Sequence, residues 1–304
     1  MLRRMLLYLS ERGWLRRWIE NSSVSRRLTS RFIAGQTLDD GIQVLQNLLN
    51  ERILGTLDCL GENVASLADA ARSRDSYLAA LTEIDRAKLS ATVSIKLTQF
   101  GLDFSESACR ENVIALIQRA KSMNTRVEVD MESSAHTERT LQFVSGFQDL
   151  LPGHVRAVIQ AYLYRSEADI RMLSERSIPI RLCKGAYREP ASVAFTRKSD
   201  VDANYVRLMK LLLAQGVYPA VATHDEAIVR EAVRHIRERN IPADRFEFQM
   251  LYGIRRDLQR ELVSQGFRLR LYVPYGDAWY PYFMRRLAER PANLLFLARN
   301  LVRS

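Results

Sequence analysis

Two adjacent arginines near the C-terminal end, Arg285 and Arg286, are the residues best suited to bind a small charged molecule. Tyr282 precedes them and Glu289 follows, each three or four residues away. At 3.6 residues per helical turn the four side chains share one broad face of a helix. Two planar guanidinium groups at this spacing can bind one carboxylate from two directions, which a pair of lysines does less well. A solvated arginine pair on an exposed helix face is the alternative that this segment leaves open.

A strand leads into this predicted helix. Residues 268–273, RLRLYV, alternate between polar and apolar side chains, which is typical of a strand with one buried face. Pro274 and Gly276 then interrupt the strand. The pattern predicts a strand, a short turn and a helix that carries the two arginines.

The same unit of a short strand followed by a helical stretch occurs eight times. The predicted strands lie at residues 53–62, 92–97, 126–131, 155–162, 178–185, 218–224, 246–251 and 268–273. Strands separated by helices predict a parallel sheet, and eight such units predict closure into a (β/α)8 barrel. The expected fold class is therefore α/β, with a helical segment over residues 1–50 and a TIM-type barrel domain over residues 51–304.

One face of these strands is apolar, while the other face carries polar and charged side chains. They are Lys96, Glu128, Asp130, Gln160, Arg181, Gln249 and Tyr272. In a closed barrel the inner face lines the lumen, so these side chains should converge there. Burying several charges is costly unless they are paired or bound, so a charged ligand or cofactor would explain the set. An internal ion pair or a hydrogen-bonded buried amide is the alternative for each residue taken singly.

The formal net charge of +10 is concentrated at the N-terminal end. Residues 1–31 contain eight arginines and two glutamates and so carry +6 of that charge, while the other 273 residues are nearly balanced. This distribution argues against nucleic-acid binding by the domain. Apolar residues at helical spacing between the arginines predict a basic amphipathic helix. An organelle-targeting sequence, a membrane-surface helix and a helix packed on the domain all stay open.

Other classes of site lack support in the sequence. The three cysteines have no paired spacing and the four histidines include no pair at ligand spacing, so we expect no metal and a reducing compartment. No glycine-rich dinucleotide fingerprint follows a strand. No apolar run approaches the roughly 20 residues that span a bilayer. The expected location is the cytoplasm, with peripheral contact at the inner face of the membrane as an option for the basic helix.

Several sequence blocks occur together in a characteristic order between about residue 90 and residue 293. They are VSIKL, VDME, QAYLYR, RLCKGAYRE, ATHDE, FEFQMLYG and YVPYG, the last followed by Tyr282 and by RRL at residues 285–287. FIAGQTLDD and LGE lie further upstream. With these blocks the chain resembles the proline dehydrogenase family in its single-function bacterial form. Because the sequence ends at Ser304, we expect the single-function form and not the bifunctional form with an aldehyde dehydrogenase domain.

The resemblance implies a distorted (β/α)8 barrel that holds FAD and oxidises L-proline to Δ1-pyrroline-5-carboxylate, with a quinone as electron acceptor. The substrate-binding residues that it implies are Lys96, Tyr272, Tyr282, Arg285, Arg286 and Glu289. In that scheme the two arginines bind the proline carboxylate, and the lysine and glutamate extend the ion-pair network around it. The two tyrosines shape the pocket over the pyrrolidine ring.

The resemblance also implies a set of cofactor-binding residues. They are Asp130, Met131, Gln160, Arg181, Lys184, Gly185, Ala186, Thr223 and His224, and the catalytic residues among the implied set are Asp130, Arg181 and Lys96. Arg181 would lie beside the isoalloxazine, where a cation can stabilise the negative charge of the reduced flavin. The Lys-Gly-Ala segment would meet the ribityl-phosphate portion, and the Thr-His pair would meet the pyrophosphate or adenosine.

Two functions of other classes stay open when only the residues are considered. A non-catalytic barrel protein could act at a membrane surface through its basic N-terminal helix, although the convergent polar lumen argues against this. A metal-dependent barrel hydrolase is less consistent with the sequence, because the histidines lack ligand spacing. Flavin absorption bands in the purified protein would distinguish the enzyme from the binding protein.

Overall fold

The computed structural model describes residues 31–61, 64–280 and 282–284. Eight parallel strands pair in chain order and close into a barrel, with β8 returning to β1. The strands are β1 (Leu54–Cys59), β2 (Ala91–Ile95), β3 (Val127–Val129), β4 (Val155–Gln160), β5 (Ile180–Cys183), β6 (Ala220–Ala222), β7 (Glu247–Leu251) and β8 (Leu269–Tyr275). Each overlaps one of the predicted strands, so the (β/α)8 fold is confirmed.

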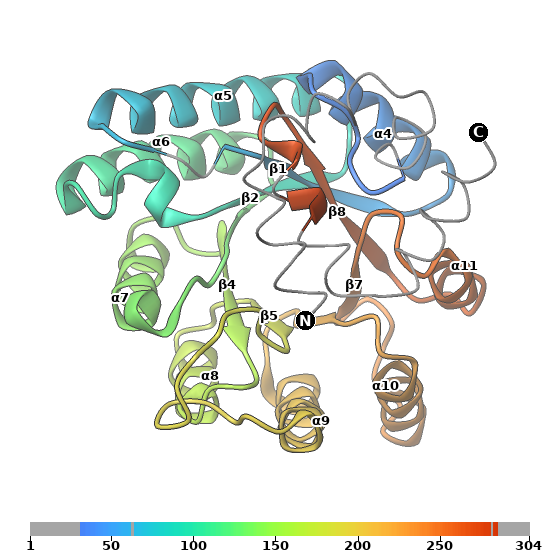
Figure 1. Cartoon of the computed structure of the whole chain (residues 1–304). Coiled ribbons are helices and arrows are strands. Elements are labelled where there is room, and N and C mark those ends of the chain that lie inside the picture. The colour runs from blue at the N-terminus through green and yellow to red at the C-terminus, as the bar shows by residue number, and fades with distance from the viewer. Residues whose placement is uncertain (1–30, 62–63, 281, 285–304) are drawn as a thin grey trace, which may run out of the picture.

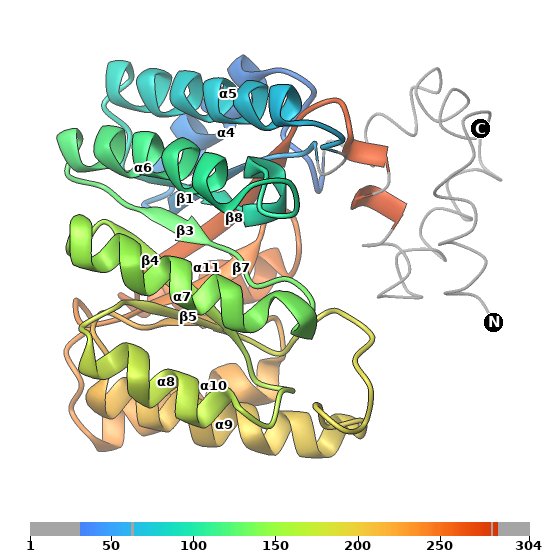
Figure 2. The same ribbon diagram turned by 90° about the vertical axis from the view of Figure 1, so that its left-hand side faces the viewer.

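Helices cover the outer face of the barrel. They are α4 (Leu38–Asn50), α5 (Leu67–Arg86), α6 (Glu106–Ser122), α7 (Ser134–Leu150), α8 (Ser166–Glu175), α9 (Lys198–Gln215), α10 (Glu226–Glu238) and α11 (Arg256–Ser264), with a short 3-10 helix, η1 (Leu97–Phe100), after β2. The helices surround the strands (Figure 1), and α5 to α8 stack along one side (Figure 2). Each helix returns the chain to the same end of the barrel, so the C-terminal ends of all strands meet at one mouth.

Alternation along each strand separates the core from the lumen. The apolar residues that RLRLYV places on one face of β8 are buried in the main core between strands and helices: Leu269, Leu271 and Val273. The same core includes the outward-facing valines of β3 and Phe248 of β7. The polar face is left to line the lumen, as the alternation predicted.

β8 runs two residues further than predicted, through Pro274 to Tyr275. The predicted interruption was wrong because a proline removes only a backbone donor, and both carbonyls still accept hydrogen bonds here. Ala34 donates its amide to the Pro274 carbonyl at 2.9 Å, and Leu60 donates to the Tyr275 carbonyl at 2.8 Å. Neighbouring segments therefore hold the strand extended to the mouth of the barrel.

Helix α4 closes the barrel over β1 and β8. Thr37 caps the helix, because its hydroxyl accepts from the Asp40 amide at 3.2 Å while the Asp40 carboxylate accepts from the Thr37 amide at 2.9 Å. Leu45 packs over Gly55, where an added Cβ would lie 2.0 Å from the leucine side chain. α4 thus packs on the main core through its buried apolar residues. The amphipathic helix predicted in residues 1–23 lies outside the described residues, and the domain division at residue 50 stays a prediction.

Candidate active site

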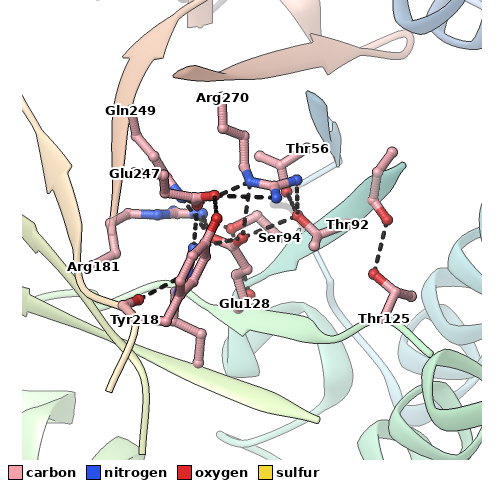
Figure 3. Close-up of polar contacts among 12 residues, drawn as sticks. Thr56, Thr92, Ser94, Thr125, Glu128, Arg181, Tyr218, Glu247, Gln249 and Arg270 are labelled. Atoms are coloured by element: carbon pink, nitrogen blue, oxygen red, sulfur yellow. Dashed lines mark hydrogen bonds and ion pairs between the residues drawn. The ribbon is translucent and has the colours of Figure 1, made fainter. Parts of the chain in front are cut away.

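Two arginines and two glutamates form a buried ion-pair layer in the N-terminal half of the lumen. Arg156 Nη1 donates to Glu247 Oε1 at 2.6 Å and to Glu128 Oε1 at 3.2 Å. Arg270 donates from Nε to Glu247 Oε1 at 3.0 Å and from Nη2 to Glu247 Oε2 at 3.2 Å. Figure 3 shows Glu128, Glu247 and Arg270 converging from three strands. The internal ion pair that the sequence left open for Glu128 is therefore confirmed.

Arg181 joins this layer to the C-terminal mouth. Its Nη2 donates to Glu128 Oε2, and its Nη1 donates to Asp130 Oδ1 at 2.6 Å. The Tyr272 ring centroid lies 5.5 Å from the guanidinium carbon, and Tyr272 Oη donates to Asp130 Oδ2 at 2.8 Å. Within the described part of the chain, the buried Arg181 Nε has no hydrogen-bond partner. Four of the predicted lumen residues therefore meet at one point.

The ion pairs keep these buried groups charged. Burial by itself would raise the pKa of Glu128, but three guanidiniums, with Arg181 the strongest, lower it to about 2. Burial also opposes ionisation of Glu247, yet Arg270 and Arg156 hold its pKa well below the usual value. Burial opposes the charge of Arg181, but its two carboxylate neighbours raise its pKa above the ordinary value. Arg181 is therefore a permanent cation just beneath the mouth.

Lys96 and Gln160 lie at the C-terminal ends of their strands. Lys96 follows β2, and its Nζ is 3.7 Å from Asp58 Oδ1. Gln160 ends β4 and donates from Nε2 to the Glu132 carbonyl at 2.7 Å. This donation orients the side-chain amide, so that Gln160 Oε1 is the atom that can accept from a ligand. Both residues thus lie at the end where barrels of this type build active sites.

Comparison with known proteins identifies the family. The family model described as proline dehydrogenase matches residues 42–299. Proline dehydrogenase 1 of Bacillus subtilis strain 168 is 40% identical over 307 residues, which cover 100% of both chains. The proline dehydrogenase of Deinococcus radiodurans is 41% identical over 280 residues, covering 91% of this chain and 90% of its own. The chain belongs to the proline dehydrogenase family.

Longer members of the same group share the barrel. The solved structure of proline utilization A from Bdellovibrio bacteriovorus, inactivated by N-propargylglycine, matches with a TM-score of 0.80 and 25% identity over 86% of this chain. This chain spans 32% of that protein and 24% of the bifunctional protein PutA of Salmonella typhimurium, to which it is 27% identical. The resemblance to proline dehydrogenases inferred from the sequence blocks is therefore confirmed.

In this proline dehydrogenase barrel the loop after β5 is fixed by its lysine. Lys184 Nζ donates to Asp225 Oδ2 at 2.8 Å and also to Asp202 Oδ1. Gly185 follows with φ +112°, a conformation that side chains rarely adopt, and an added Cβ would lie 2.4 Å from the Tyr162 ring. Two carboxylates already pair with the ammonium group. A cofactor bound at this loop would therefore contact backbone atoms of the loop and not the lysine Nζ. The predicted cofactor role of the loop stays a prediction.

Thr223 and His224 follow β6 at the same mouth. Thr223 Oγ1 accepts from the Asp225 amide at 3.1 Å, and His224 Nε2 accepts from the Leu251 amide at 2.8 Å. A backbone N–H can only donate, so His224 Nε2 carries no proton and the neutral ring carries its proton on Nδ1. His224 can therefore act through Nδ1 only as a hydrogen-bond donor.

Three of the predicted substrate-binding residues lie within the described part of the chain. Lys96 and Tyr272 lie in the lumen as given above, and Tyr282 is buried at the mouth in an apolar cluster with Trp279 and Phe283. The other three, Arg285, Arg286 and Glu289, lie outside the described residues. The binding of the substrate carboxylate by Arg285 and Arg286, called the substrate clamp below, therefore stays a prediction.

Arg156 and Glu247 were not predicted as lumen residues, although the sequence contains the signal. Arg156 lies four residues before Gln160 in β4, and Glu247 lies two residues before Gln249 in β7. Alternate residues of a strand face the same side, so both belong to the inner face. Both stand near the N-terminal ends of their strands, away from the mouth, which is consistent with a structural role.

Within residues 31–61, 64–280 and 282–284, no three histidine, cysteine, aspartate or glutamate side chains are grouped as a metal site. No helix in that part of the chain is long and apolar enough to cross a membrane. Cys59, Cys109 and Cys183 are all free thiols.

Proposed function

We propose that this protein oxidises L-proline to Δ1-pyrroline-5-carboxylate with FAD bound at the C-terminal mouth of the barrel, and passes the electrons to a quinone. Membership of the proline dehydrogenase family supports the substrate. The observation that carries the location of the cofactor is Arg181, a permanent cation that joins the buried ion pairs to Asp130 at the mouth.

Two features of this mouth fit a flavin. The buried Arg181 Nε, which has no partner in the described part of the chain, calls for an acceptor, because an unmet buried donor costs about 1–3 kcal/mol. Gly185 fixes the loop beside it, because its positive φ and the close approach of the Tyr162 ring leave no room for a side chain, so this loop has a defined backbone next to the mouth. When bound, FAD supplies the hydride acceptor that no amino-acid side chain provides.

The side chains of the protein orient the substrate and balance its charge. In the proposed site Arg285 and Arg286 bind the proline carboxylate, and Lys96 adds a third positive charge. Tyr272, held in place by its bond to Asp130, forms a wall over the pyrrolidine ring. Fixing a small substrate against the reacting group in this way contributes up to about 7–11 kcal/mol to lowering the barrier.

The absorption spectrum of the purified protein tests this proposal directly. We expect visible flavin bands that bleach when L-proline is added without oxygen and return when a soluble quinone is added. A folded, colourless protein that binds no added FAD would rule out the proposed chemistry.

If Arg285 and Arg286 form the substrate clamp, replacing either of them should lower kcat/KM for L-proline without loss of flavin. Hydrogen bonds to charged groups contribute about 1.5–3 kcal/mol each, so Arg285→Met should lower kcat/KM for L-proline by about one to two powers of ten. Arg286→Lys keeps the charge but loses the planar fork, so it should show a smaller loss. Steady-state kinetics and inhibition by a ring carboxylate measure both effects.

In both clamp variants KM and the inhibition constant should rise together while flavin content stays constant. The matched control is Arg171→Met, which removes an exposed arginine that pairs with Glu167 four residues away on α8. If either clamp variant kept the kcat/KM of the unmodified protein, the arginine pair would be an ordinary solvated helix face.

Because His224 carries its proton on Nδ1, replacement by glutamine and replacement by asparagine should affect FAD binding to different extents. Asparagine places an amide N–H near the position of Nδ1, whereas glutamine places its amide near Nε2. If Nδ1–H donates to a cofactor phosphate, His224→Gln should weaken FAD binding by roughly ten- to a hundredfold, while His224→Asn should change it little. Titration of the apoprotein with FAD, followed by flavin fluorescence, measures this difference.

Thermal unfolding of the apoproteins should show the reverse order. His224→Asn leaves the Leu251 amide without its acceptor and should lower Tm more than His224→Gln does. The partly exposed His235 on α10 provides the control replacement. Equal loss of FAD affinity in both variants would contradict the proposed donor role of Nδ1.

A further inference from the structure

Ser94 on β2 carries a buried hydroxyl group that belongs to none of the predicted sets of site residues. The residue is completely buried and stands opposite Glu128 in the pairing of β2 with β3. Its side chain lies in the lumen beside Glu128 and Arg181 (Figure 3). A serine hydroxyl can donate one hydrogen bond and accept others, and a buried one is normally engaged in both ways.

The hydroxyl group bridges Arg181 and Asp130. Ser94 Oγ donates to Asp130 Oδ1 at 2.9 Å and accepts from Arg181 Nη1 at 3.3 Å. Arg181 Nη1 itself donates to Asp130 Oδ1 at 2.6 Å, so the three atoms form a closed triangle. The Glu128 carbonyl lies 3.4 Å from Ser94 Oγ, but the carboxylate is nearer and charged, which makes it the stronger acceptor.

Ser94 completes the set of donors around the Asp130 carboxylate. Oδ1 accepts from Ser94 and Arg181, and Oδ2 accepts from Tyr272 at 2.8 Å. A hydrogen bond to a carboxylate stabilises its negative charge. Ser94 therefore supplies part of the stabilisation that Arg181 would otherwise supply alone, and less of the positive charge of Arg181 is neutralised by Asp130.

The same hydroxyl group helps to fix the plane of the Arg181 guanidinium. Nη2 donates to Glu128, while Nη1 lies between Asp130 and Ser94, so both ends of the planar fork are held. These contacts come from β2, from β3 and from the residue that follows β3. They fix the direction of the buried Nε–H, which has no partner in the part of the chain that the structure describes.

We propose that Ser94 is a positioning residue of the cofactor site: by bridging Arg181 and Asp130 it orients the guanidinium and keeps its positive charge available to the reduced flavin. This inference rests on the proposed function, because it assumes that FAD binds at the mouth beside Arg181. Ser94 acts through Arg181 and Asp130.

The test is Ser94→Ala, which removes the hydroxyl group and little volume. Loss of one buried hydrogen-bonding group should weaken the binding of oxidised FAD by roughly tenfold. Reduced flavin should lose more affinity than oxidised flavin, because Asp130 then neutralises more of the charge of Arg181, and the reduction potential should fall. Fluorescence titration of the apoprotein with FAD and redox titration of the loaded protein measure the two effects.

Thr125→Val is the matched control. Thr125 Oγ1 donates to the Ala91 carbonyl at 2.9 Å at the N-terminal end of the same pair of strands, away from the mouth. Valine keeps the shape of threonine but lacks the hydroxyl group, so this variant should keep the FAD affinity and the potential of the unmodified protein. An unchanged potential in Ser94→Ala, or an equal change in Thr125→Val, would overturn the proposal.

Ser94→Cys distinguishes hydrogen bonding from the filling of space. The thiol fills the site, but it is a weaker donor and acceptor than the hydroxyl group, so the potential should again fall. If Ser94→Ala does not fold, this variant decides the question. A cysteine variant with the potential of the unmodified protein would show that Ser94 only fills space, and the proposal would be wrong.

A double-variant cycle tests whether Ser94 acts through Asp130. Asp130→Asn removes the charge of the acceptor, so Ser94→Ala should cause a smaller loss in that background than in the unmodified protein. The cycle is read in the FAD dissociation constant and in the urea midpoint of the apoproteins, which stays measurable in a variant that binds FAD weakly. Additive losses in both measurements would contradict the bridge.

The same measurements separate this inference from the proposed function. If the unmodified protein binds no FAD, the proposed function fails and the inference fails with it. If the unmodified protein binds FAD and oxidises L-proline while Ser94→Ala has the same potential, only the role of Ser94 fails.

Discussion

Arg181→Met is expected to empty the cofactor site and to destabilise the fold. The change removes the guanidinium from between Glu128 and Asp130, leaving two carboxylates beneath the mouth with less positive charge. Breaking a buried ion pair by removing one partner costs about 3–5 kcal/mol. Any flavin that remains should have a lower reduction potential, because the cation that favours the negatively charged reduced form is gone. Flavin content after gel filtration, redox titration and urea unfolding measure the three effects.

The control for this prediction is Arg139→Met. Arg139 also lies between two carboxylates, Asp103 and Glu106, but all three side chains are partly exposed. Exposed pairs of this kind contribute about 0–1 kcal/mol, so this variant should keep its flavin and most of its stability. Full flavin occupancy with an unchanged potential in Arg181→Met would refute the placement of Arg181 beside the flavin.

The convergence of the lumen residues could be predicted from the sequence because it depends on two simple rules. The order of strands around a barrel follows the order along the chain, and alternate residues of a strand face the same side. These rules place Glu128 of β3, Arg181 of β5 and Tyr272 of β8 inside the barrel, and the structure joins them through hydrogen bonds to one another or to Asp130. The rules apply equally to Arg156 and Glu247, although the predicted set of lumen residues does not contain them.

The partner of each charged side chain could not be predicted in the same way. The resemblance implies that Lys184 meets the ribityl-phosphate portion of the cofactor, and the structure shows its ammonium group in contact with carboxylates 18 and 41 residues further along the chain. Those contacts depend on where the first turns of α9 and α10 meet the loop after β5, and a periodic pattern does not specify that distance. The bond from the Leu251 amide to His224 likewise depends on the register between β6 and β7.

Arg156→Met should produce the largest loss of stability among replacements of lumen residues that lie away from the mouth. Arg156 is completely buried and its Nη1 contacts both Glu128 and Glu247. Removing it leaves one uncompensated negative charge in the layer, which should lower the free energy of unfolding by about 3–5 kcal/mol. Urea unfolding at pH 7 measures this loss. The control Arg176→Met removes a partly exposed arginine that pairs with the exposed Asp149, and should cost about 1 kcal/mol or less.

The pH dependence of unfolding should identify the cause of that loss. In the unmodified protein the pKa of Glu128 is lowered to about 2, and that of Glu247 lies well below its usual value. A depressed carboxyl pKa contributes stability that is fully present above the unfolded value near 4.5 and is lost as the pH falls toward the folded value. Removing Arg156 raises both folded pKa values, so the acid unfolding of Arg156→Met should begin at a higher pH.

A second replacement distinguishes unpaired charge from lost packing. In Arg156→Met/Glu247→Gln the positive and negative charges of the layer balance again, because Arg270 and Arg181 remain to pair with Glu128 and Asp130. The double variant should therefore regain part of the stability lost in Arg156→Met, and its acid unfolding should return toward lower pH. If the double variant is no more stable than Arg156→Met, the loss comes from the missing side-chain volume, and the ion-pair layer is not what holds this end of the lumen together.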